Sequence, residues 1–118
     1  MFAELLGSVV SRMSGVVGAT LMGFDGIAIE SVTGNEPGDW QSTTIELGSI
    51  AKQLQRISEN MGTGDVRELI VKTGALTTVL RPLTPEYFVA LVLSTGANAG
   101  KARYLLRVVG PKLERELA

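Results

Sequence analysis

Apolar side chains recur with helical spacing near both ends of the chain. From Phe2 to Met13 they fall at i, i+3, i+4 and i+7, which predicts a short amphipathic first helix. A similar stripe begins after Asn98, a residue type that often caps a helix start. We expect Gly110-Pro111 to kink or interrupt this last helix, because proline removes a backbone donor and clashes with the preceding turn.

The middle of the chain carries the longest helical pattern. Thr43 and Glu46 have the spacing of a capping box, and Gly62 suits the left-handed residue that often ends a helix. The second helix is therefore predicted from Thr43 to Met61. Its apolar stripe, predicted to face the core, consists of Leu47, Ile50, Ala51, Leu54, Ile57 and Met61.

Five extended segments surround this helix. Asp25-Gly26 predicts a two-residue hairpin turn, since both positions tolerate positive φ, and a loop rich in Gly, Asn, Pro and Asp follows from Thr33 to Ser42. Three more segments follow the second helix at spacings too short for a parallel crossover, so they are predicted to pair antiparallel. The predicted strands are residues 16–24, 27–32, 66–73, 76–83 and 87–94.

The last predicted strand is apolar from Tyr87 to Leu93. A strand without alternation is covered on both faces, so we expect it near the centre of the sheet with helices on both sides. The sequence thus predicts one α+β domain over residues 1–118, with the element order α-ββ-α-βββ-α.

The amino-acid composition limits the kinds of catalytic and binding site that the chain can form. The chain has no cysteine and no histidine, which removes thiol chemistry and the commonest zinc ligands and general base. Carboxylates are scattered through turns, loops and strands. We expect no catalytic site, no metal and no cofactor.

The net charge of −1 offers no basic field for nucleic acid. The 45% hydrophobic content suggests that another chain covers part of the surface.

The segment from Ser94 to Leu106 lies between a predicted strand and a predicted helix, as a phosphate-binding loop does. However, only three residues separate Gly96 from Gly100-Lys101, where a P-loop has four, and Ala102 offers no hydroxyl to a metal. We therefore expect a turn between a strand and a helix, and no ATP or GTP binding.

The N-terminal segment shows helical periodicity and carries Glu4, unlike a signal peptide. No apolar run reaches membrane-spanning length. These features predict a cytoplasmic protein with no membrane insertion.

Trp40 stands in a polar loop before the second helix and has two interpretations. It could cover the helix start as a satellite of the core, or it could anchor an interface, where tryptophan is enriched.

The segment "SGVVGATLMGFDGIAIESV" resembles the opening hairpin of the Roadblock / dynein light chain family. The segment "ELIVKTGALTTVLRPLTPEYFVALVL" is similar to the three-strand meander of that family. The element order matches throughout, and the third helix resembles prokaryotic, MglB-like members. The resemblance implies a profilin-like, five-stranded antiparallel sheet with the second helix on one face and the other two helices on the opposite face.

The resemblance also implies partners. Family members form homodimers by pairing the third strand with its two-fold mate, which places the two second helices side by side. The matching dimer residues here are Arg67, Glu68, Leu69, Ile70, Val71, Lys72 and Thr73. Several members bind a small Ras-like GTPase through the helix-bearing surface. The outward residues expected to contact it are Ser49, Lys52, Gln53, Arg56 and Asn60.

Three functional hypotheses follow. The first is a non-catalytic homodimeric regulator or scaffold that binds a small Ras-like GTPase and activates or localises it. The second is an adaptor subunit of a larger complex without a GTPase partner, and the third is an undetected enzyme or small-ligand binder.

Overall fold

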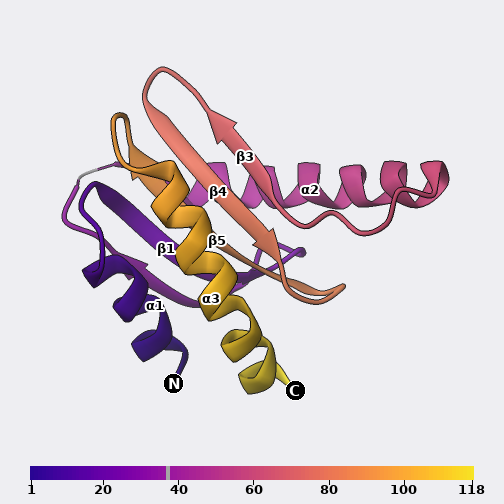
Figure 1. Cartoon of the computed structure of the whole chain (residues 1–118), viewed down its shortest axis with the longest axis horizontal. Coiled ribbons are helices and arrows are strands. Elements are labelled where there is room, and N and C mark those ends of the chain that lie inside the picture. The colour runs from indigo at the N-terminus through magenta and orange to yellow at the C-terminus, as the bar shows by residue number, and fades with distance from the viewer. Residues whose placement is uncertain (37) are drawn as a thin grey trace.

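The computed structural model describes residues 1–36 and 38–118. Pro37, within the predicted loop from Thr33 to Ser42, lies outside the described residues. The element order α-ββ-α-βββ-α is confirmed (Figure 1). The elements are α1 (Phe2–Ser11), β1 (Val16–Gly23), β2 (Ala28–Thr33), α2 (Gln41–Met61), β3 (Leu69–Lys72), β4 (Leu76–Pro82), β5 (Tyr87–Ser94) and α3 (Ala99–Leu117).

The five strands form one sheet in the order β2-β1-β5-β4-β3, with every neighbouring pair antiparallel. The central position of β5 is confirmed, and its residues from Phe88 to Leu93 are fully buried. Continuous apolar character therefore places this strand in the middle. The two edges of the sheet are β2 and β3.

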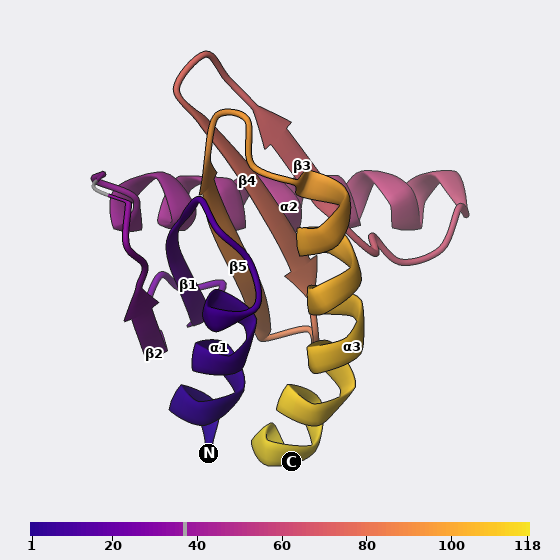
Figure 2. The same cartoon turned by 60° about the vertical axis from the view of Figure 1, so that its left-hand side comes forward.

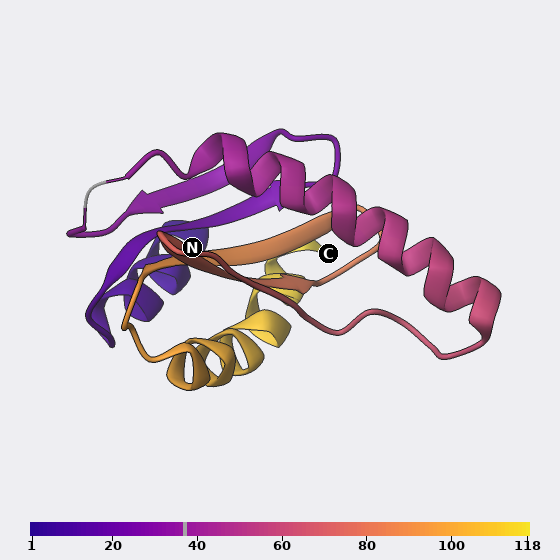
Figure 3. The same ribbon diagram turned by 90° about the horizontal axis from the view of Figure 1, so that it is seen from above.

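The sheet is covered on both faces, as the predicted fold class requires. Figure 3 shows α2 on one face and α1 and α3 on the other. The larger part of the core lies under α1 and α3, where Leu6, Leu91 and Leu106 are fully or almost fully buried. A smaller cluster lies under α2 around Leu47 and Phe88.

Only the first half of α2 packs closely on the sheet. Its buried residues are Thr44, Leu47, Gly48 and Ala51. The second half extends past β3 (Figures 1 and 3). The chain then returns through residues 62–68 to β3 after Gly62, whose left-handed conformation (φ 68°) confirms the predicted helix end.

The predicted capping box at Thr43 is wrong, because α2 begins two residues earlier, at Gln41. Trp40 precedes the helix and is buried, and its carbonyl accepts a hydrogen bond from the Thr44 hydroxyl at 2.7 Å. Packing of the Trp40 indole into the core fixes the start of the helix, so tertiary contacts override the local signal.

The hairpin between β1 and β2 differs from a two-residue turn. Gly26 has a positive φ of 90°, but Asp25 does not, and the Asp25 carboxylate accepts a hydrogen bond from the N–H of Ile27. The register also shifts, since Leu21 pairs with Glu30 and Met22 with Ala28. Ile29 is therefore an extra residue on β2, which is a β-bulge at the sheet edge.

The third helix runs through Pro111 without interruption, so the break expected at Gly110-Pro111 does not occur. Val109 and Leu113, on either side of the proline, are both buried in the larger core cluster. Packing on both sides outweighs the cost of about 3 kcal/mol that proline carries inside a helix. The predicted cap is confirmed, because Asn98 Oδ1 accepts a hydrogen bond from the Lys101 N–H at 3.0 Å.

Candidate interaction surface

The predicted dimerisation strand, residues 66–73, is shorter in the structure. Only Leu69–Lys72 form β3. Glu68 lies just outside and accepts a hydrogen bond from Arg103 of α3 at 2.8 Å. Thr73 belongs to the following turn, where its hydroxyl donates to the carbonyl of Leu76. The strand is therefore four residues long, and Arg67, Glu68 and Thr73 are not part of it.

In the described parts of the chain, β3 pairs on one side only, with β4. The Thr73 N–H donates to the carbonyl of Leu76 at 2.8 Å. Successive N–H groups of a strand point to opposite edges, so those of Ile70 and Lys72 point away from β4. The side chains alternate as well: Leu69 and Val71 pack in the cluster under α2, and Ile70 is 41% exposed. An edge with free donors and an exposed isoleucine is suited to pairing with another strand.

An apolar stripe lies on α2 at Ile50, Ile57 and Met61. We predicted these residues on the inner face, and this is wrong: their exposed fractions are 43%, 52% and 70%. Ile57 and Met61 are exposed because this half of α2 extends beyond the sheet, so no strand lies beneath them. Ile50 lies in the packed half but at the side of the helix, about 100° around the axis from the buried Ala51. We call these three residues the α2 stripe.

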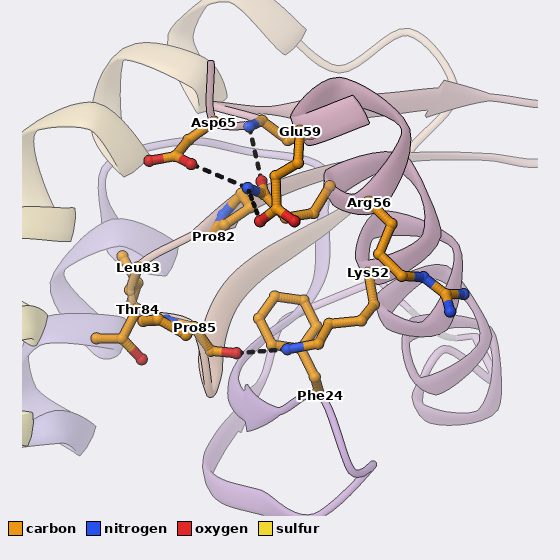
Figure 4. Close-up of a pocket in the computed structure, with 11 residues that line it drawn as sticks. Phe24, Lys52, Arg56, Glu59, Asp65, Pro82, Leu83, Thr84 and Pro85 are labelled. Carbon is orange, nitrogen blue, oxygen red and sulfur yellow. Dashed lines mark hydrogen bonds between the residues drawn. The ribbon is translucent and has the colours of Figure 1, made fainter. Parts of the chain in front are cut away.

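The five outward residues predicted on α2 (Ser49, Lys52, Gln53, Arg56 and Asn60) are all exposed. Two of them, Lys52 and Arg56, have different surroundings. The Lys52 ammonium donates to the carbonyl of Pro85 at 2.7 Å and lies 5.0 Å from the centre of the Phe24 ring. Figure 4 shows the guanidinium of Arg56 pointing away from these groups. Lys52 is thus held in place on the protein, while Arg56 points outward.

A groove of about 470 Å³ runs beside Lys52 and Arg56. It lies between α2, the turn at residues 82–85 and the returning segment at 65–66 (Figure 4). Gln55 holds this segment, because its amide nitrogen donates to Glu59 and to Asp65 and its carbonyl accepts from the Val66 N–H at 2.9 Å. The sequence pattern did not indicate this groove, since its walls come from segments far apart in the chain.

Trp40 is 1% exposed and packs with Val17 and Val92. The interpretation as an interface anchor is therefore wrong, and its role as a core satellite is confirmed. Gly18 makes this packing possible, because a Cβ at that position would lie 2.3 Å from the indole ring.

Residues 1–36 and 38–118 contain no cluster of three or more carboxylates that could hold a metal ion. Within the same residues, no helix has the length and apolar character needed to cross a bilayer.

Several solved structures share this fold. MglC from Myxococcus xanthus is 36% identical in sequence, with a TM-score of 0.71 over 98% of both chains. The gliding protein MglB of Thermus thermophilus is 16% identical, with a TM-score of 0.83 over 98% of this chain and 89% of that one. A Roadblock/LC7 domain from Streptomyces avermitilis is 17% identical, with a TM-score of 0.82 over 97% and 95%. No model of a protein family and no curated protein matches the chain. MglC resembles this chain in both sequence and fold. The MglB and Roadblock/LC7 structures show a similarity of fold alone.

Proposed function

Because this chain belongs to the Roadblock/LC7 family, among its MglC- and MglB-like members, we propose that it acts as a homodimeric regulator or scaffold without a catalytic site. The observation that carries this proposal is the open edge of β3, and the exposed α2 stripe adds to it. An unpaired edge and an exposed apolar row are both liabilities in a monomer, and one partner covers both.

The dimer joins β3 to β3 of a second copy around a two-fold axis. Each protomer then contributes the same surface, as isologous interfaces require. In this proposed dimer, the half of α2 that extends past β3 would reach over the partner protomer, and Ile57 and Met61, which are exposed in the single chain, would enter the interface. Burial of the α2 stripe contributes roughly 25 cal/mol for each Å² of apolar surface removed from water.

We expect light scattering at micromolar concentration to give twice the chain mass of 12.5 kDa. Ile57→Asp should shift the mass towards the monomer, because a carboxylate in an apolar interface carries a desolvation cost. The matched control is Gln53→Asp on the outward face of the same helix, which should stay dimeric. A wild-type monomer at this concentration would reject the proposal.

The partner of the dimer is a small Ras-like GTPase that docks on the outward face of α2. Two observations support this choice: the predicted contact residues are all exposed, and Arg56 projects from the groove. In the proposed dimer, two-fold symmetry would double this surface. One GTPase could then contact both copies, at a ratio of two chains to one GTPase.

Lys52→Glu combined with Arg56→Glu should weaken GTPase binding by about tenfold or more, through repulsion and unpaired partner charges. The measurement is titration of the dimer with the GTPase that co-purifies with it, loaded with GDP or with a GTP analogue. Binding should favour one nucleotide state, because the terminal phosphate orders the switch loops. The control with the same charge change is Lys112→Glu with Arg115→Glu on α3. Unchanged affinity in a folded α2 variant would reject this docking surface.

An adaptor role without a GTPase is the second candidate. The observation that favours it is the setting of Lys52, whose ammonium is already bound to the Pro85 carbonyl and lies near the Phe24 ring. If no GTPase co-purifies with the wild-type dimer and a related light chain does, the adaptor role replaces the first candidate.

A further inference from the structure

Charge is distributed unevenly between α3 and the remainder of the protein. Five of the eleven cations and two of the twelve carboxylates of the chain lie in α3, so this helix carries +3 while the other residues together carry −4. The chain as a whole has a net charge of −1, but α3 is basic and the remainder of the chain is acidic.

The stability of α3 accounts for only part of these cations: Arg115 lies in the last turn, where a cation is favourable. The positive end of a helix dipole is at its N-terminus, where cations are unfavourable by about 0.3–1 kcal/mol each. Yet Lys101 lies in the first turn and Arg103 in the second, and the first turn has no acidic residue. Arg103 pairs with Glu68, and this is the one salt bridge among residues 1–36 and 38–118. Lys101, Arg107 and Lys112 need another explanation.

These cations surround an exposed apolar row. Tyr104 is 53% exposed and Val108, one turn later, is 37% exposed. The Arg107 guanidinium lies 5.6 Å from the centre of the Tyr104 ring, close enough for a cation–π contact that restrains both side chains. The α3 ridge is defined here as six exposed residues: Lys101, Tyr104, Arg107, Val108, Lys112 and Arg115.

The α3 ridge is independent of the surfaces described above. It lies on the face of the sheet opposite α2 (Figures 2 and 3), away from the groove and the α2 stripe. A partner on the ridge could therefore bind at the same time as a partner on α2.

We propose that the α3 ridge docks an acidic amphipathic helix of a partner protein. An apolar row flanked by cations is complementary to a helix whose apolar row is flanked by Glu or Asp. With a rise of about 1.5 Å per residue, the ridge from Lys101 to Arg115 offers a contact of roughly 22 Å, enough for about four turns of a partner helix.

Two other anionic partners fit less well. A duplex nucleic acid would bring a long row of phosphates near the acidic remainder of the chain, which carries −4. A membrane surface needs apolar side chains that insert, and the ridge has only Tyr104 and Val108.

The test uses the full-length protein and a fluorescent helical peptide with leucines at i, i+4 and i+7 and glutamates on both flanks. A peptide of the same composition in scrambled order is the probe control. We expect binding to the ordered peptide to be at least fivefold tighter and to weaken as salt is raised, since charge pairs at a surface are screened. Equal binding of both peptides would overturn the proposal, as it would show attraction by charge alone.

Lys101→Glu combined with Arg107→Glu should weaken peptide binding by about tenfold or more. The matched control is Lys52→Glu with Arg56→Glu on α2, which makes the same charge change on the opposite face and should bind normally. Equal losses in both variants would overturn the assignment to α3. Because the α3 variant keeps β3 and α2 intact, light scattering separates failure of this proposal from failure of the dimer.

A photoreactive benzoyl-phenylalanine in place of Tyr104 identifies the natural partner. Cross-linking in lysate should join position 104 to an acidic helix of another protein. Cross-links to lipid, to nucleic acid or to a second copy of this chain would overturn the proposal, as would the absence of a protein cross-link.

Discussion

Ile70→Pro should weaken the proposed homodimer by about a hundredfold while the protomer stays folded. The N–H of Ile70 points away from β4, so proline removes a donor that a partner strand would use and leaves the facing carbonyl unpaired. An unpaired group costs about 1–3 kcal/mol, and two-fold symmetry applies this cost twice. A cost of about 1.4 kcal/mol at each of the two sites gives about a hundredfold change in the dissociation constant. Sedimentation across a concentration series measures this change.

Val71→Pro is the matched control on the same strand. The N–H of Val71 points towards β4, so proline there breaks the ladder inside the protomer. It should lower the free energy of unfolding, whereas Ile70→Pro should change mainly the dissociation constant. An Ile70→Pro variant that is still dimeric at the wild-type dissociation constant would show that the interface lies elsewhere.

Trp40→Ala should lower the free energy of unfolding by about 3–5 kcal/mol, the cost of removing a large buried aromatic side chain. That loss is a large fraction of the roughly 5–15 kcal/mol typical of a folded domain. Denaturant unfolding at a fixed protomer concentration measures it, because association would otherwise shift the apparent stability.

Gly18→Ala tests the same contact from the other side. Its Cβ would lie 2.3 Å from the Trp40 ring, so we expect a loss of about 1–3 kcal/mol from overpacking. Gly7→Ala in α1 is the control: it meets no atom within 4 Å and should stabilise the helix by about 0.5–1 kcal/mol. In the Trp40→Ala background the cost of Gly18→Ala should largely vanish. Equal costs in both backgrounds would contradict this packing.

Most of the fold could be predicted from the sequence because its signals are local. The helical spacing between Phe2 and Met13 and the continuous apolar run of β5 depend on neighbouring residues alone. The cap at Asn98 is likewise a short-range feature, and the structure confirms it.

The errors arose where distant segments decide the outcome. The start of α2 depends on Trp40, which packs against Val17 of β1 and Val92 of β5, and the helix through Pro111 depends on core contacts on both sides of it. The apolar spacing of α2 identified Ile57 and Met61 as apolar-face residues, but it gave no information on where the sheet ends. The predicted contact residues for the dimer and the GTPase stay predictions, because a surface does not reveal its partner through its own periodicity.

The bulge at Ile29 bears on how far assembly can continue. Joining β3 to β3 uses that edge on both protomers at once, so the extended sheet would end in a β2 strand on each side. At the bulge two residues of β2 oppose one of β1, which bends the strand and interrupts its regular row of backbone donors and acceptors. A bent edge is a poor template for further strands. The closed pair is therefore the expected end point, and growth into filaments is disfavoured by the shape of the terminal strands.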